Sequence, residues 1–100
     1  MDWKKKQRMA ELGHNSNSKK EFFEFCLNNV ENFDDQDWMI FADLVFIVPS
    51  DMIKDIEFWK EMYPFMKKYD FGKDEIAFRS YVRLKLIVSN CEDKLNINLN

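Results

Sequence analysis

Turn-forming residues are scarce in this chain, and this scarcity constrains the fold more than any other feature. Only 2 glycines and 2 prolines occur among 100 residues. Sandwiches and barrels require many tight turns, in which glycine and proline are the usual residues. Hydrophobic residues make up 46% of the chain and charged residues 33%, a composition typical of a folded domain with one core. The sequence therefore predicts an all-α bundle of about four main helices.

Two helices are predicted in the first half of the chain. Apolar residues recur at helical spacing over about 19–32, and Ser18 with Glu21 predicts a capping box at the start of this helix. The acidic run 34–37 is typical of a second helix start, because aspartates accept hydrogen bonds from unpaired amides. The run WMIFADLVFIV continues this helix and is apolar nearly all round, so we expect it at the centre of the bundle.

The second half predicts a helix with a kink and then a last long helix. Apolar residues at helical spacing follow Pro49, but Pro64 lies inside the pattern and removes an amide donor. We expect one piece over about 51–62, a kink at Pro64 and a shorter piece over 64–69. The last helix should begin near Asp74, with its apolar stripe formed by Ala77, Tyr81, Leu84, Val88 and Cys91.

An α+β fold is the alternative, because three segments also carry strand signals. β-branched residues gather at 44–48, and apolar residues alternate with other residues at 82–88 and in the tail. The combined length of the run from residue 35 and the acidic start before the last helix favour helices over strands. Whether residues 82–88 are helix or strand stays open at this level.

Charge divides the chain into a basic arm and an acidic body. Residues 1–20 hold 6 basic and 2 acidic side chains, so 6 − 2 = +4, and residues 21–100 hold 9 and 16, so 9 − 16 = −7. Gly13 is a natural end for a short helix in the arm. We predict an N-terminal arm over 1–17, a helical domain over 18–94 and a C-terminal tail over 95–100.

The residues just after the arm helix carry one short resemblance. Gly13, His14, Asn15 and Ser16 form a tetrapeptide that resembles one found near the start of various small phage and bacterial proteins. The resemblance covers 4 of 100 residues and identifies no functional residue. It implies only an origin on a mobile element.

No constellation of residues in the sequence is typical of catalysis. The chain has 1 histidine and 2 cysteines, without the spacing of a zinc site, and the acidic run at 34–37 is explained by helix capping. We therefore predict no enzyme activity, no metal and no cofactor. The first residues lack the apolar run of a signal peptide, and no run is long enough to span a membrane. A cytoplasmic protein without a membrane partner is expected.

Surplus aromatic residues predict a protein interface. Core packing explains most of them, but the segment FWKEMYPFMKKYDF holds more rings than one helix face can bury. We therefore predict that the chain binds a protein partner or forms a homo-oligomer, in the manner of phage accessory proteins or inhibitors of host machinery such as a defence complex. The predicted interaction residues are Phe58, Met62, Phe65, Phe71 and Trp3.

Nucleic-acid binding is the alternative function. Basic residues of the arm and of the last helix could contact phosphates, and affinity would then fall steeply with salt. The acidic body and the pI of about 5.1 weigh against this hypothesis. The residues that would carry it are Lys4, Lys5, Lys6, Arg8, Arg79 and Arg83.

Overall fold

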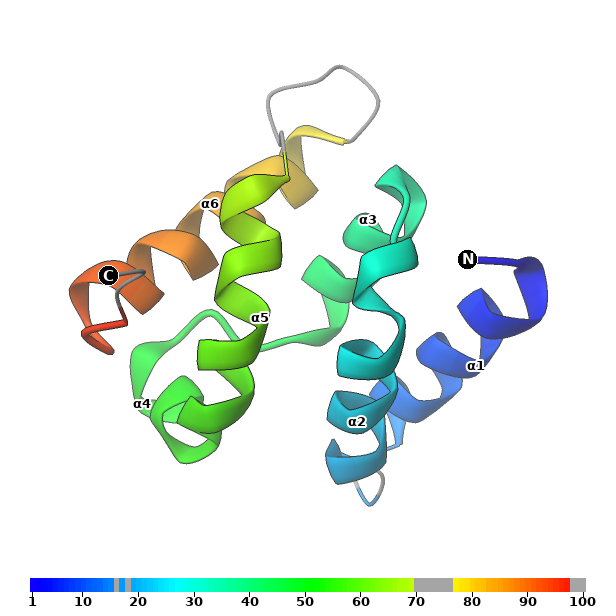
Figure 1. The fold of residues 1–100 in the computed structure, drawn as a ribbon, viewed down its shortest axis with the longest axis horizontal. Helices are drawn as coiled ribbons and strands as arrows, with labels where there is room; N and C mark the ends of the chain where they lie inside the picture. The colour runs from blue at the N-terminus through cyan, green and yellow to red at the C-terminus, as the bar shows by residue number, and fades with distance from the viewer. Residues whose placement is uncertain (16, 18, 70–76, 98–100) are drawn as a thin grey trace.

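Residues 1–15, 17, 19–69 and 77–97 are described by the computed structural model, and they contain helices and no strand. The described elements are α1 (Trp3–His14), α2 (Lys19–Asn29), α3 (Asp35–Leu44), α4 (Pro49–Met52), α5 (Ile56–Lys68) and α6 (Phe78–Asp93) (Figure 1). The all-α prediction is confirmed. The α+β alternative is wrong, because residues 82–88 lie inside α6 and residues 45–48 form a connection without strand pairing.

The start of α3 follows the prediction from the acidic run. Asp34 is the N-cap of α3, and its side chain accepts a hydrogen bond from the amide of Asp37 at 2.9 Å. The Asp37 carboxylate accepts one from the amide of Asp34 at 2.9 Å, which completes a capping box. The box predicted at the start of α2 depends on Ser18, which lies outside the described residues.

Helix α3 ends at Leu44, earlier than the apolar run predicts. Two side chains of α6 bind carbonyls in the last turn of α3 and just after it: the Arg83 guanidinium donates to Ala42 O at 2.7 Å and to Val45 O at 3.1 Å, and Asn90 donates to Ile47 O. Pro49 also disfavours helical angles at the preceding residue, and Val48 is extended. The chain leaves the helix here because α6 supplies hydrogen bonds that the helix would otherwise supply.

The helix after Pro49 is divided, but not at the position expected. A 3₁₀ turn at Ile53–Asp55 joins α4 to α5, whereas α5 is one element from Ile56 to Lys68 with Pro64 inside it. The expected separation into pieces at 62 and 64 is therefore wrong. Pro64 and Lys60 are exposed, so the carbonyl of Lys60 that loses its donor lies on the side facing water.

Helix α1 occupies most of the predicted arm and belongs to the core. Met9 and Leu12 are buried, and α1 packs against both α2 and α3. Gly13 does not end the helix, which runs on to His14. A Cβ atom at Gly13 would lie 2.5 Å from Cδ1 and 3.1 Å from Cβ of Leu44, so this glycine lets α1 approach α3 closely.

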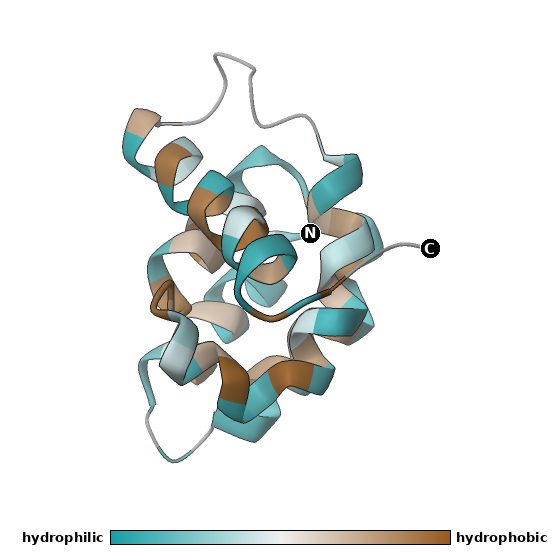
Figure 2. Ribbon diagram, turned by 90° about the vertical axis from the view of Figure 1, so that its left-hand side faces the viewer, coloured by the Kyte–Doolittle hydropathy of each residue, from teal (hydrophilic) through white to brown (hydrophobic). Residues whose placement is uncertain are grey.

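Helix α5 lies between α2 and α6 and supplies much of the core (Figure 1). Figure 2 shows hydrophobic and hydrophilic positions alternating along the helices, as expected when each buries one face. In the tail, Leu95 and Ile97 are also buried, and the Ile97 amide donates to Cys91 O at 2.9 Å. None of the helices in the described ranges is long and apolar enough to cross a membrane.

Candidate functional site

The aromatic and methionine side chains predicted as an interface are mostly covered. Phe58 and Met62 are buried in the core, and Phe65 is partly buried against it. The expectation that α5 leaves these side chains exposed is wrong for Phe58 and Met62, because α2 and α6 cover α5 on two sides. Phe71 lies outside the described residues, and Trp3, at 69% exposure, is the one of these described residues with a fully open ring.

The six basic residues proposed for nucleic-acid binding do not form one surface. Lys6 is buried in an ion-pair cluster, and the half-buried Arg83 binds one carbonyl of α3 and one of the α3–α4 connection, so both side chains already have partners within the fold. Arg8 lies 3.8 Å from Glu11 and 3.9 Å from Glu21. The remaining exposed residues are Lys4, Lys5 and Arg79.

Lys6 joins α1 to the start of α3 through a cluster that the sequence analysis missed. Its Nζ lies 2.8 Å from Asp34 and 2.7 Å from Asp37, whose side chain is fully buried, and the Met1 amine lies 2.7 Å from Asp37. Burial alone would raise the pKa of Asp34, but the hydrogen bond and charge of Lys6 lower it to about 2. The same bonds raise the pKa of Lys6 against the opposing effect of burial. This cluster holds α1 against the start of α3, and its charged groups are paired with one another.

Helix α6 presents an exposed apolar stripe. Phe78, Val82 and Leu86 are 79%, 36% and 44% exposed and lie four residues apart, so they follow one side of the helix. The opposite side, with Leu84, Ile87 and Cys91, is buried. We call Phe78, Val82 and Leu86 the α6 stripe. Once Leu84 and Ile87 are assigned to the core, helical spacing alone places these three residues on the outer side, a signal that the sequence analysis did not use.

Basic residues flank the α6 stripe. The Arg79 side chain is 78% exposed and lies 3.9 Å from Asp43, and the Lys85 ammonium lies 5.6 Å from the centre of the Tyr81 ring. The Phe78 and Tyr81 rings stack with centroids 6.4 Å apart, which extends the apolar surface at the start of α6. Aromatic and arginine side chains are the residues most enriched at the centres of protein interfaces.

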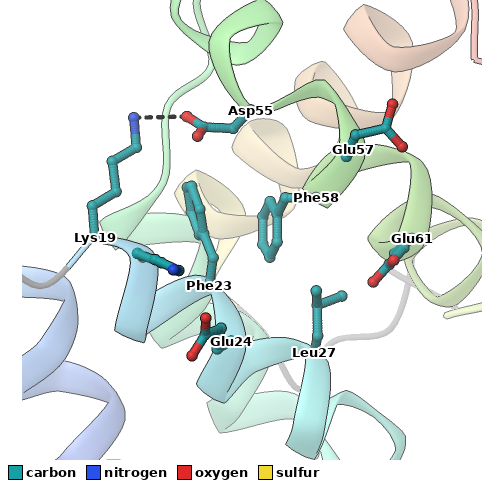
Figure 3. Close-up of a pocket in the computed structure, with 9 residues that line it drawn as sticks. Lys19, Phe23, Glu24, Leu27, Asp55, Glu57, Phe58 and Glu61 are labelled. Atoms are coloured by element: carbon teal, nitrogen blue, oxygen red, sulfur yellow. Dashed lines mark ion pairs between the residues drawn. The ribbon is translucent and has the colours of Figure 1, made fainter.

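A groove of about 590 Å³ lies between α2 and α5 (Figure 3). Its floor is the stacked pair Phe23 and Phe58, whose ring centroids are 3.9 Å apart, with Leu27 beside them. Lys20 and Glu24 of α2 line one side, and Glu57 and Glu61 of α5 line the other. We call this feature the α2–α5 groove.

An ion pair closes one end of the α2–α5 groove. The Lys19 ammonium lies 2.7 Å from Asp55 and also 4.3 Å from the centre of the Phe46 ring. Glu57 lies 3.4 Å from Lys60, whereas Glu24 and Glu61 form no ion pair with any residue in the described part of the chain. The groove thus combines an apolar floor with two carboxylates, Glu24 and Glu61, that have no ion-pair partner among the described residues.

The titratable groups of the core are held in their uncharged or paired forms. Burial raises the pKa of the Cys26 thiol above its ordinary range and that of Cys91 to about 12. Tyr63 of α5 donates to Glu92 of α6, and burial followed by that bond raises the pKa of Tyr63 to about 12. Lys67 lies 2.9 Å from the same carboxylate. Among the described residues, no three histidine, cysteine or acidic side chains gather as a metal site.

Comparison of the chain with protein-family models, with curated proteins and with solved structures gives no match. The α6 stripe and the α2–α5 groove are therefore interpreted from their own residues. Both have apolar side chains with charges beside them, basic on the stripe and, in the groove, four carboxylates against two lysines. This arrangement suits binding through surface contacts.

Proposed function

We propose that this chain is a non-catalytic protein-interaction protein that docks its α6 stripe on a protein partner. The observation that carries the proposal is the line of exposed apolar side chains at Phe78, Val82 and Leu86. Burying one phenylalanine or leucine side chain fully contributes about 1.5–3 kcal/mol. Covering the stripe would therefore supply enough free energy to form the centre of an interface.

The charges beside the stripe define the chemistry of the partner. Arg79 and Lys85 flank the apolar line, and Arg79 has only a distant carboxylate, Asp43 at 3.9 Å. A partner surface with apolar side chains and carboxylates would match both features, because opposite charges steer the encounter and set the orientation. The partner is thus an apolar, acidic protein surface.

Site-specific crosslinking tests this proposal. A photoreactive phenylalanine analogue replaces Phe78 in one sample and Leu86 in another, and Gln7, an exposed residue of α1, in the control. The chain is irradiated in its native cells, and the crosslinked peptides are identified by mass spectrometry. We expect positions 78 and 86 to capture the same acidic, apolar peptide and position 7 not to capture it. The proposal is wrong if the two stripe positions yield nothing beyond the control.

The same experiment also tests the alternative function, nucleic-acid binding. With Lys6 and Arg83 in structural roles, it depends on Lys4, Lys5, Arg8 and Arg79, and no described contact joins the first three residues to the fourth. Nuclease digestion after irradiation separates the two functions. Nucleotide remnants attached at positions 78 and 86, in place of crosslinked peptides, would favour nucleic acid over a protein partner.

A further inference from the structure

We propose that the partner of the α6 stripe is a second copy of this chain, which receives the stripe in its α2–α5 groove. The inference rests on the proposed function, because it names the partner of the same surface. The stripe is apolar with basic flanks, whereas four carboxylates against Lys19 and Lys20 line the groove around the narrow exposed edges of Phe23 and Phe58, so the two surfaces are complementary in charge. A single chain carries both.

Some carboxylates of the α2–α5 groove are not neutralised by nearby basic residues. Glu57 and Glu61 are one helical turn apart on α5, where like charges repel, and Glu24 and Lys20 of α2 line the same groove (Figure 3). The Lys60 contact to Glu57, at 3.4 Å on the exposed surface, compensates for this repulsion only weakly. A cation of the partner can pair with Glu24 or Glu61 while an apolar side chain covers the exposed edges of the Phe23 and Phe58 rings.

The stripe carries the matching cations in a suitable place. Arg79 is adjacent to Phe78, the most exposed ring of the stripe, and Lys85 is adjacent to Leu86. When Phe78 covers the groove floor, Arg79 lies within reach of a carboxylate wall. The guanidinium group can bind a carboxylate through two hydrogen bonds, which fixes orientation as well as adding affinity.

A symmetric pairing of two α6 stripes is disfavoured by charge. If two α6 helices packed antiparallel about Val82, Arg79 of each copy would lie opposite Lys85 of the other. Like charges at an interface cost affinity and suppress such a contact. Contact between stripe and groove avoids this repulsion and uses a different patch on each copy.

The position of the two surfaces determines the kind of assembly. Helix α5 separates α6, which carries the stripe, from α2, which forms one wall of the groove (Figure 1). Each copy can therefore offer its stripe to one neighbour and its groove to another. Such a head-to-tail contact produces rings or chains of copies instead of a closed two-fold dimer.

Two complementary variants test this assembly by sedimentation velocity. The stripe variant carries Phe78→Ser, Arg79→Glu and Leu86→Ser, and the groove variant carries Glu24→Lys and Glu61→Lys. All five positions are exposed, so both variants should keep the thermal melting curve of the parent chain, which is measured as a control. Val48→Ser, an exposed apolar change outside both surfaces, is the matched control for the stripe.

We expect the parent chain to associate with rising concentration and to dissociate with added salt, since the interacting charges are screened. Each variant alone should associate at least about tenfold more weakly. An equimolar mixture of the two should form a dimer that grows no further, because the intact groove of one variant binds the intact stripe of the other.

The inference is overturned by either of two results. The first is a parent chain that remains monomeric up to about 1 mM, because any self-association would then be too weak to matter. The second is a parent chain that associates while the mixture of the two variants forms no dimer. The crosslinking experiment separates this failure from failure of the proposed function. A monomeric parent whose positions 78 and 86 capture another protein would refute self-assembly and support the proposed function.

Discussion

At the scale of single residues, the role of Lys6 in the structure differs from the role that the sequence predicts. In the sequence it is one of several basic residues of an apparent arm, whereas in the fold it lies against Asp34 and the fully buried Asp37. Removing one partner of a buried ion pair is costly, because the remaining charge keeps its desolvation penalty.

We predict that Lys6→Ala destabilises the chain by about 3 kcal/mol, because Asp37 is left buried beside fewer donors. The exposed neighbour Lys5 provides the matched control, and Lys5→Ala should change stability by less than about 0.5 kcal/mol. Urea denaturation followed by circular dichroism measures both. Equal stability of the two variants would contradict the structural role of Lys6.

Because the pKa of the Asp34 carboxylate is lowered in the folded chain, we predict that the chain loses stability in acid. Its pKa is about 2 in the folded chain against an ordinary 3.8, so the folded state binds this proton less readily than the unfolded state. This contribution is present above the ordinary value and is lost as pH falls from about 4 towards 2. Melting temperatures measured across this range should show a smaller decline for Asp34→Asn, which keeps a capping side chain but has no such carboxylate. Identical declines would contradict the prediction.

At the scale of elements, the contact between α1 and α3 depends on the absence of a side chain at Gly13. Alanine would favour the helix by up to about 1 kcal/mol, but its Cβ would lie 2.5 Å from Leu44 Cδ1. Overpacking of this kind costs about 1–3 kcal/mol. The sign of the net change in stability shows which of these two effects is larger.

We predict that Gly13→Ala destabilises the parent chain by about 1 kcal/mol but stabilises a Leu44→Ala background, where the obstructing side chain is gone. A double-mutant cycle in urea measures the difference between the two backgrounds. If Gly13→Ala has the same effect in both, the close approach of α1 and α3 does not depend on this position.

The elements also show which local signals predict structure well. Asp34 was predicted as a helix start and is the N-cap of α3, because capping involves residues that are neighbours in the chain. The end of α3 was predicted about four residues too late, because the carbonyls of Ala42, Val45 and Ile47 are satisfied by Arg83 and Asn90 of α6. No local pattern reveals a hydrogen bond from a helix some forty residues away.

At the scale of the whole molecule, the chemical reactivity of the two buried thiols can be used to measure how often the core opens. Cys26 and Cys91 are fully buried in α2 and α6. Burial keeps the pKa of Cys91 at about 12, so the reactive thiolate is scarce even before access is considered.

We predict that both thiols react with a soluble disulfide reagent only at the rate of global unfolding. Pulse labelling followed by mass spectrometry should therefore detect chains with no label or two labels, and few with one. The rate should rise in the Lys6→Ala variant. Fast labelling of one thiol in the folded chain would show that its helix opens independently of the rest.

The whole molecule also decided which apolar residues remain outside. The sequence analysis placed the interface on α5, at Phe58 and Met62, because that segment is the richest in rings and methionines. In the fold α5 is enclosed by α2 and α6, and the open apolar line belongs to α6 instead. The prediction of an interface thus stays a prediction, now carried by Phe78, Val82 and Leu86.

The sequence by itself determined the helical fold class, because periodic apolar spacing, scarce turn residues and capping aspartates are all local properties of neighbouring residues. Only the tertiary structure decided that Lys6 is buried, that Phe58 is covered and that the α6 stripe is exposed. Burial depends on which helix faces meet across the core, and that arrangement is set by packing between segments that are distant in the chain.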